Sequence, residues 1–188
     1  GLPQTSPALD VMKVNFAGTR RVTEQVLPLM SEGGAIVSIS SNGGLGWSRR
    51  IPVHMQLMQI DTYEGVVKWV QENAETVAEG YAFSKEAIIV WTMLMSSRLI
   101  KKGIRINCTM PGPTQTPMMS HFEQATKASV LDAAMQPINR RSTPDEQAGP
   151  VLFLNSPKAS YINGVALAVD GGFLGGVATG QIDLRTLM

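Results

Sequence analysis

A tyrosine and a lysine one helical turn apart are the pair in this sequence best suited to proton transfer. They are Tyr81 and Lys85, in the segment Tyr81-Ala82-Phe83-Ser84-Lys85. On a helix, residues with this spacing lie on the same face with Cβ atoms about 6 Å apart. A phenol with a pKa of about 10 is a poor acid–base group at neutral pH, but a neighbouring ammonium lowers that pKa. The pair therefore predicts general acid–base catalysis by Tyr81.

Ser41 is the group expected to face this pair. It follows residues 35–40, an apolar run rich in β-branched side chains that predicts a parallel strand buried on both faces. The turn sequence Ser41-Asn42-Gly43-Gly44 ends the strand. Ligands of open α/β sheets bind beyond the carboxyl ends of the strands. We therefore expect the Ser41 hydroxyl to hold a substrate oxygen while Tyr81 gives or takes its proton.

Alternating helices and strands must position these groups. Apolar residues recur every three or four positions over residues 8–30 and 61–78, which predicts amphipathic helices. Residues 81–101 predict a largely buried helix, residues 104–110 and 164–169 predict further strands, and Thr143-Pro144-Asp145-Glu146 predicts a capped helix start. The alternation predicts a single α/β domain over residues 1–188 with a parallel sheet. Residues 113–135 are expected to form a lid over a pocket.

The composition limits the partners of this chain. Sixteen basic and 15 acidic side chains give a net charge of +1, with no run of like charges longer than a pair, which argues against nucleic acid. No stretch approaches the roughly 18 apolar residues of a membrane span, so we expect no membrane partner and a cytoplasmic protein. The single cysteine, Cys108, excludes an internal disulfide and is expected to be a buried, inert thiol in a reducing compartment.

The order of these residues along the chain resembles the short-chain dehydrogenase/reductase family, whose YxxxK motif is matched by Tyr81 and Lys85. The resemblance implies an α/β fold with a Rossmann-like, doubly wound parallel sheet, of which this chain carries the C-terminal part only. It implies NAD or NADP as the cofactor, and hydride transfer between that cofactor and an alcohol or carbonyl. It also implies that Lys85 lowers the pKa of Tyr81 and binds the cofactor ribose.

Three further segments carry the resemblance. The run Val14-Asn15-Phe16-Ala17-Gly18 resembles the family's helix that bears a relay asparagine, so Asn15 is expected to anchor a relay water. Ser38-Ile39-Ser40-Ser41 resembles the strand that ends in the catalytic serine. Residues 105–112 resemble the family's R-x-N-x-x-x-P-G motif. The resemblance places the nicotinamide against the loop that follows, which contains Pro111, Gly112, Pro113, Thr114 and Thr116.

The chain departs from the family's pattern in two places. The helix at 61–78 is inserted between Ser41 and Tyr81, which makes the chain similar to the coniferyl-alcohol dehydrogenase and 3α-hydroxysteroid dehydrogenase subgroup. That similarity implies a small hydrophobic alcohol or carbonyl substrate. The family's TGxxxGxG turn is absent from the sequence, which starts at Gly1, so we expect an N-terminal βαβαβ segment to be missing. Because family members are usually dimers or tetramers, a homo-oligomer is also expected.

Other interpretations of these residues stay open. The chain could be a non-catalytic remnant that acts as an interaction module through an exposed apolar sheet edge. An isomerase or epimerase of the extended branch would use the same serine, tyrosine and lysine, but the short C-terminal region argues against it. The glycines after the last strand are expected to form a flexible tail, since no helix is predicted there, and His54 and His121 to be ordinary polar residues. Several methionines could line a substrate site or fill the core: Met110, Met118, Met119 and Met135.

Overall fold

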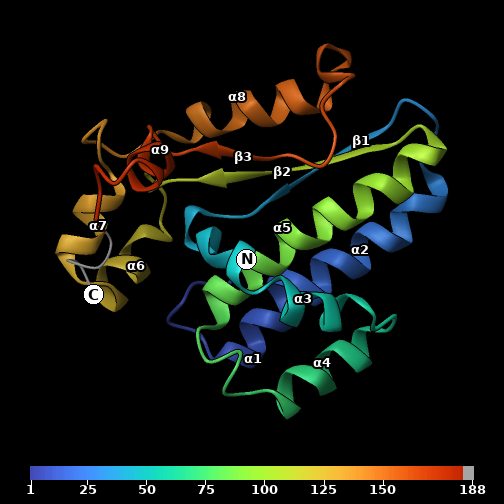
Figure 1. Ribbon diagram of the computed structural model, residues 1–188, viewed down its shortest axis with the longest axis horizontal. Coiled ribbons are helices and arrows are strands. Elements are labelled where there is room, and N and C mark those ends of the chain that lie inside the picture. Colours follow the sequence, from blue (N-terminus) through green and yellow to red (C-terminus); the bar gives the residue numbers. More distant parts are fainter. Residues whose placement is uncertain (184–188) are drawn as a thin grey trace.

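The computed structural model describes residues 1–183, in which three parallel strands lie between helices on both sides (Figure 1). The strands are β1 (Ala35–Ile39), β2 (Arg105–Pro111) and β3 (Ala166–Val169), in the order β1-β2-β3. Val37 pairs with Asn107, and Cys108 pairs with Ala166. The structure therefore confirms the predicted parallel α/β sheet.

The helices cover the two faces of the sheet as a Rossmann-like fold requires. Helix α8 (Pro144–Asn155) lies on one face, and α5 (Gly80–Leu99) lies on the other with α2 (Thr19–Val26) beside it (Figure 1). The segment before α2 contains α1 (Ala8–Val11) and the π-helix η1 (Met12–Gly18). Short 3₁₀ helices are η2 (Leu27–Leu29), η4 (Ile100–Lys102) and η5 (Pro157–Ala159).

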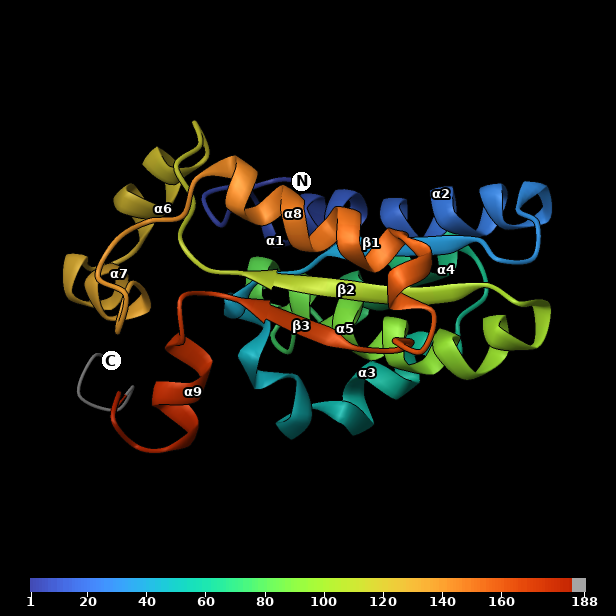
Figure 2. The same ribbon diagram turned by 90° about the horizontal axis from the view of Figure 1, so that it is seen from above.

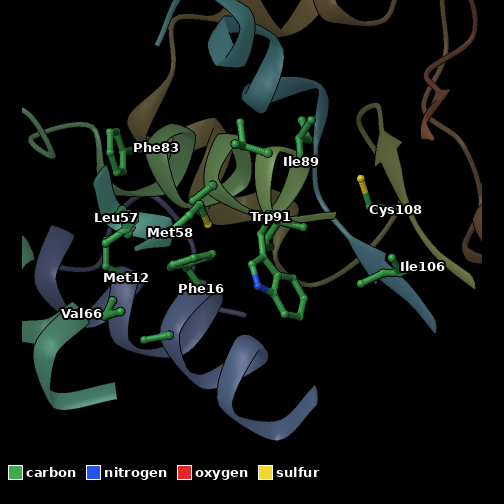
Figure 3. Packing of buried hydrophobic residues seen from close by; sticks show 14 of the residues in the cluster. Met12, Phe16, Leu57, Met58, Val66, Phe83, Ile89, Trp91, Ile106 and Cys108 are labelled. Carbon is green, nitrogen blue, oxygen red and sulfur yellow. The ribbon is translucent and has the colours of Figure 1, made fainter. Parts of the chain in front are cut away.

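The main core packs around α5. Its members include Phe83 and Trp91 of α5, Phe16 of η1, and Leu57 (Figure 3). Burying a large apolar side chain contributes about 1.5–3 kcal/mol relative to exposure, so this packing holds α5 firmly between the sheet and the insertion. The predicted buried helix is confirmed, and its packing fixes the residues that it carries.

The inserted segment contains more structure than the sequence indicated. It comprises the 3₁₀ helix η3 (Asn42–Arg49), α3 (Ile51–Met58) and α4 (Tyr63–Glu72). Only α4 was expected, and it is shorter than the predicted range 61–78. In Figure 1 α3 and α4 lie on the side of α5 that faces away from the sheet. The insertion thus forms a third layer, packed against α5 and η1.

The capped start of α8 was predicted correctly. The Thr143 hydroxyl accepts a hydrogen bond from the backbone N–H of Glu146 at 3.3 Å, and the Glu146 carboxylate accepts one from the backbone N–H of Thr143 at 2.8 Å. This reciprocal pair satisfies two backbone donors that a helix start otherwise leaves free.

Three local predictions were wrong. The helix at 8–30 is not α-helical throughout, because η1 makes a π-helical turn within it. Strand β1 is not buried on both faces: it is an edge strand among the described residues, and Ile39 is 48% exposed. A helix, α9 (Phe173–Ala178), follows β3 where a flexible tail was expected. The Asp170 carboxylate accepts hydrogen bonds from the backbone N–H groups of Gly172 and Leu174, which stabilises the start of α9.

Helices α6 (Met119–Ala125) and α7 (Ala128–Ala134) form the segment predicted as a lid. Figures 1 and 2 place them, with α9, beyond the carboxyl ends of β2 and β3. Over residues 1–183, every helix is too short or too polar to cross a bilayer.

Candidate functional site

Tyr81 lies in the first turn of α5, at the end of the sheet where the strands terminate. The preceding residue, Gly80, brings this turn close to α1, because a Cβ atom at that position would lie 2.5 Å from Cα of Ala8. The start of the helix is therefore held against α1, and the phenol is held at the mouth of a cleft.

Ser41 and Tyr81 face each other across Gly43. A Cβ atom on Gly43 would lie 3.4 Å from both Ser41 Oγ and Tyr81 Cε1. Ser41 precedes η3, and its hydroxyl oxygen accepts a hydrogen bond from the backbone N–H of Gly43 at 3.0 Å. The same hydroxyl donates a long hydrogen bond to Asn42 Oδ1, at 3.4 Å. The predicted approach of these two side chains is observed.

Lys85 lies one turn after Tyr81, under the ring. Its Nζ is 5.6 Å from the centroid of the Tyr81 ring and donates a hydrogen bond to the backbone carbonyl of Ile39 at 2.9 Å. The side chain is only 9% exposed. This burial lowers the pKa of Lys85 to about 8, against a smaller opposing effect of Cys108. The ammonium is thus fixed by the last residue of β1.

The pKa of Tyr81 is raised above its ordinary value. Burial of the phenol raises it, and the hydrogen bond with Ser41 lowers it by a smaller amount. The expectation that Lys85 lowers this pKa stays a prediction, because the net effect of the surroundings in this structure is upward. Ser41 is therefore the group that makes proton loss from Tyr81 easier here.

Asn15 is buried at the centre of the π-helix η1, and its side chain makes two hydrogen bonds to the backbone of Leu2. Its Oδ1 accepts a hydrogen bond from the backbone N–H of Leu2 at 2.6 Å, and its Nδ2 donates one to the Leu2 carbonyl at 2.9 Å. The side chain therefore holds the segment around Leu2 at the edge of the cleft. Its role as the anchor of a relay water stays a prediction.

The loop after β2 lines the cleft, as the sequence predicts. Pro111, Gly112, Pro113, Thr114 and Thr116 are all on its wall. The Thr114 hydroxyl donates to the Gly112 carbonyl at 2.9 Å and accepts from Ser142 at 3.0 Å, so its hydrogen bonds shape the loop. Thr116 is exposed to the cleft, which leaves it better placed than Thr114 to meet a ligand.

The cleft has a volume of about 1990 Å³ and runs from Tyr81 along β1 to α2 and α8. Ordinary ligand pockets occupy about 300–1,000 Å³, so there is room for two molecules side by side. Apolar side chains from α6 and α7 line the end near Tyr81: Met119, Phe122, Val130 and Leu131. One end of the cleft is therefore apolar and adjoins the acid–base group.

Two residues near the site were missed or misread in the sequence. Phe122 of α6 packs edge-on against the Tyr81 ring, with 5.1 Å between ring centroids; nothing in the sequence indicates this contact. His54 is not an ordinary polar residue, because it is fully buried and hydrogen-bonded to Glu86.

Of the methionines that could line a substrate site or fill the core, Met110 belongs to the core, whereas Met118 and Met119 line the cleft.

Comparison with known proteins identifies relatives across most of the chain. Residues 65–174 match the family described as enoyl-(acyl carrier protein) reductase. The chain is 31% identical over 173 residues to a coniferyl-alcohol dehydrogenase of Pseudomonas sp. strain HR199, an alignment that covers 92% of this chain and 68% of that protein. It is 26% identical to a 3-alpha-hydroxysteroid dehydrogenase/carbonyl reductase of Comamonas testosteroni, covering 90% of this chain and 68% of that protein.

A solved structure shows the same fold. The 3-alpha-hydroxysteroid dehydrogenase from Pseudomonas sp. B-0831, complexed with NADH, aligns with a TM-score of 0.77 at 25% sequence identity. The alignment covers 96% of this chain and 72% of that chain. This chain therefore spans roughly two thirds of the length of these three relatives.

Proposed function

Because this chain belongs to the short-chain dehydrogenase/reductase family, we propose that it carries the catalytic part of an NAD(P)-dependent oxidoreductase that interconverts an alcohol and a carbonyl. The observation that supports this proposal is the meeting of Ser41, Tyr81 and Lys85 at one end of the cleft. The relatives described above are named as dehydrogenases and reductases, so the alternative of a non-catalytic interaction module has no support from them.

The three side chains divide the work of proton transfer. Tyr81 gives a proton to the substrate oxygen during reduction and takes it during oxidation. Ser41, whose O–H makes only a long hydrogen bond of 3.4 Å to Asn42 Oδ1, holds that oxygen and lowers the pKa of the phenol. The Lys85 ammonium, 5.6 Å from the ring centroid, stabilises negative charge that develops on Tyr81. The nicotinamide, when bound, supplies or accepts the hydride.

The cleft fits the nicotinamide half of such a cofactor. Lys85 and Thr116 both line the cleft, where a ribose hydroxyl and a carboxamide find a donor and an acceptor. We assign ribose binding to Lys85 and carboxamide binding to Thr116 and the backbone around Gly112 and Pro113. The choice between NAD and NADP is not made by these residues.

We assign a small hydrophobic substrate to the apolar end of the cleft. The lining residues there come from α6 and α7, within the segment 113–135 proposed as a lid. Apolar walls with one polar, acid–base end are typical of sites for hydrophobic alcohols. The relatives named for a coniferyl alcohol and a 3-alpha-hydroxysteroid act on substrates of this class.

We also propose that the protein forms a homo-oligomer. The support is family membership, since members of the family are usually dimers or tetramers. Helix α4 packs against η1 and α1, so the insertion covers part of their surface, and the proposal does not choose between a dimer and a tetramer. Light scattering on the purified protein measures the assembly directly, and a monomeric mass would contradict this proposal.

Tyr81→Phe tests the enzymatic assignment, because it removes one hydroxyl and keeps the ring that packs on Phe122. We expect turnover of hydrophobic alcohols by the full-length protein, followed by NAD(P)H absorbance, to fall by about 10²- to 10⁴-fold. Tyr161→Phe is the matched control, because Tyr161 is fully exposed and far from chemistry by this assignment. Turnover of Tyr81→Phe close to that of the parent would refute the assignment.

A further inference from the structure

A glutamate lies buried directly after the lysine of the site. Glu86 is only 1% exposed, although its side chain ends in a carboxylate. A buried charge is costly unless it is paired and hydrogen-bonded. Its position next to Lys85 on α5 suggests that its partners matter for the site as well as for the fold.

Both carboxylate oxygens of Glu86 have partners in the inserted segment. Oε1 accepts a hydrogen bond from the Arg50 guanidinium at 2.7 Å, and Oε2 pairs with His54 Nε2 at 2.9 Å. His54 is fully buried, whereas Arg50 is partly exposed and stacks over the Phe83 ring at 5.5 Å. Glu79, which is exposed, lies 3.8 Å from the same guanidinium. The carboxylate therefore ties α5 to the junction of η3 and α3.

The backbone of η3 approaches α5 at the same place. A Cβ atom on Gly44 would lie 3.0 Å from the carbonyl carbon of Lys85, and one on Gly46 would lie 2.5 Å from Glu86 Oε1. The Ser40 hydroxyl donates a hydrogen bond to the Lys85 carbonyl at 2.7 Å. The chain on both sides of Ser41 is thus fixed to one turn of α5.

Stability alone does not explain this arrangement. Buried ion pairs are often no more stabilising than apolar residues of the same volume, whereas they do fix one geometry because each charge accepts few arrangements. Here the geometry that is fixed includes the segment that carries Ser41, and Ser41 must meet both Tyr81 and a substrate oxygen. A displacement of about 1 Å at such a site lowers turnover by as much as about 10²-fold.

We propose that Glu86 is a positioning residue that, through Arg50 and His54, holds the segment bearing Ser41 against the helix bearing Tyr81 and Lys85. The inference rests on the proposed function, because it assigns Glu86 a part in the same reaction. By this proposal the inserted segment, through Arg50 and His54, helps to position the catalytic groups in addition to covering α5.

Glu86→Gln tests this role, because glutamine has nearly the same shape and lacks the charge. We expect kcat to fall by about 10- to 100-fold, with the cofactor KM changed by less than about twofold. We also expect the Tyr81 pKa to rise both in Glu86→Gln and in Ser41→Ala, since both variants weaken the hydrogen bond that lowers it. Ultraviolet titration of the phenol, with Tyr81→Phe as the reference and circular dichroism to confirm folding, measures that rise.

A double-mutant cycle separates positioning from simple loss of stability. If Glu86 acts through Ser41, the pair Ser41→Ala and Glu86→Gln lowers kcat little more than Ser41→Ala alone. Glu72→Gln is the matched control, because it makes the same change of charge at an exposed ion pair with Lys68 that lies outside the cleft, and it should leave kcat unchanged. Gly46→Ala is the second probe, to be used if Glu86→Gln does not fold. Its added methyl group displaces the Glu86 carboxylate by steric contact and leaves every charge in place.

The outcomes distinguish this inference from the proposed function. Parent-like kcat and Tyr81 pKa in a folded Glu86→Gln or Gly46→Ala protein would overturn the role of Glu86, and so would fully additive effects in the cycle. If either outcome is found and Tyr81→Phe is inactive, only the role of Glu86 is rejected and the oxidoreductase assignment stands. An active Tyr81→Phe enzyme would instead remove the assignment on which the inference rests.

Discussion

Replacing Lys85 with methionine should make the protein more stable at neutral pH while abolishing its activity. The pKa of Lys85 is lowered from 10.5 to about 8 by burial, and each pKa unit corresponds to about 1.4 kcal/mol. Keeping this amine protonated in the fold therefore costs about 3 kcal/mol. Methionine removes that cost but leaves the Ile39 carbonyl without its donor, which costs about 1 kcal/mol. The net gain in the free energy of unfolding is about 2 kcal/mol.

The gain should depend on pH with a defined sign. Between pH 8 and 10.5 the unfolded chain still binds the proton that folded Lys85 has lost, so the parent becomes more stable as the pH rises through this window. The advantage of Lys85→Met is thus fully present below about pH 8 and is lost above 10.5. Cys108, whose pKa burial raises to about 11, has the opposite pH dependence, but it is present in both proteins and largely cancels in their difference.

Urea unfolding followed by tryptophan fluorescence, over a range of pH, measures this difference. Lys68→Met is the matched control. The Lys68 side chain is 75% exposed, so the free energy of unfolding of this variant should equal that of the parent at every pH. Two results would refute the reasoning: a Lys85→Met protein less stable than the parent at neutral pH, or a stability difference that does not change between pH 8 and 10.5. Either would mean that burial does not disfavour the protonated lysine as the geometry indicates.

Two further predictions concern single groups. Cys108 is fully buried and its pKa is raised to about 11, so a maleimide should label it only after denaturation; rapid labelling of the folded protein would contradict this. Thr143→Ala removes the hydroxyl that accepts from the Glu146 N–H, and we expect the free energy of unfolding to fall by about 1 kcal/mol, with Thr143→Ser nearly unchanged. Equal losses for both substitutions would show that the cap itself contributes nothing.

The features that the sequence predicted correctly are those set by neighbouring residues. The spacing of Tyr81 and Lys85 is fixed once they lie on one helix, and the capping box needs only residues 143–146. The position of Ser41 followed from the rule that the carboxyl ends of parallel strands meet at the same edge of the sheet, where ligands bind. In each case a local pattern and one general rule of chain geometry are sufficient.

The features that it did not predict depend on contacts between distant segments. Phe122 and Tyr81 are 41 residues apart, and His54 and Glu86 are 32 apart; no periodicity relates them. The π-helix η1 has the same apolar spacing as an α-helix over its short length, so the pattern could not distinguish the two. A local signal did exist for α9, since Asp170 lies two residues before its N-cap Gly172 and accepts a hydrogen bond from Leu174, but the four glycines nearby favoured a tail.

Helix α5 carries two buried charges of opposite sign at consecutive positions, and they do not neutralise each other. Consecutive residues on an α-helix point about 100° apart, so Lys85 meets the Ile39 carbonyl of β1 while Glu86 meets Arg50 and His54 of the insertion. The chain from Ser40 to Arg50 passes from the first of these contacts to the second. Since a buried charge is tolerated only with its partners in place, the sheet and the insertion are both fixed to the turn of α5 that carries the site. The position of the Ser41 hydroxyl therefore depends on the insertion as much as on the strand that precedes it.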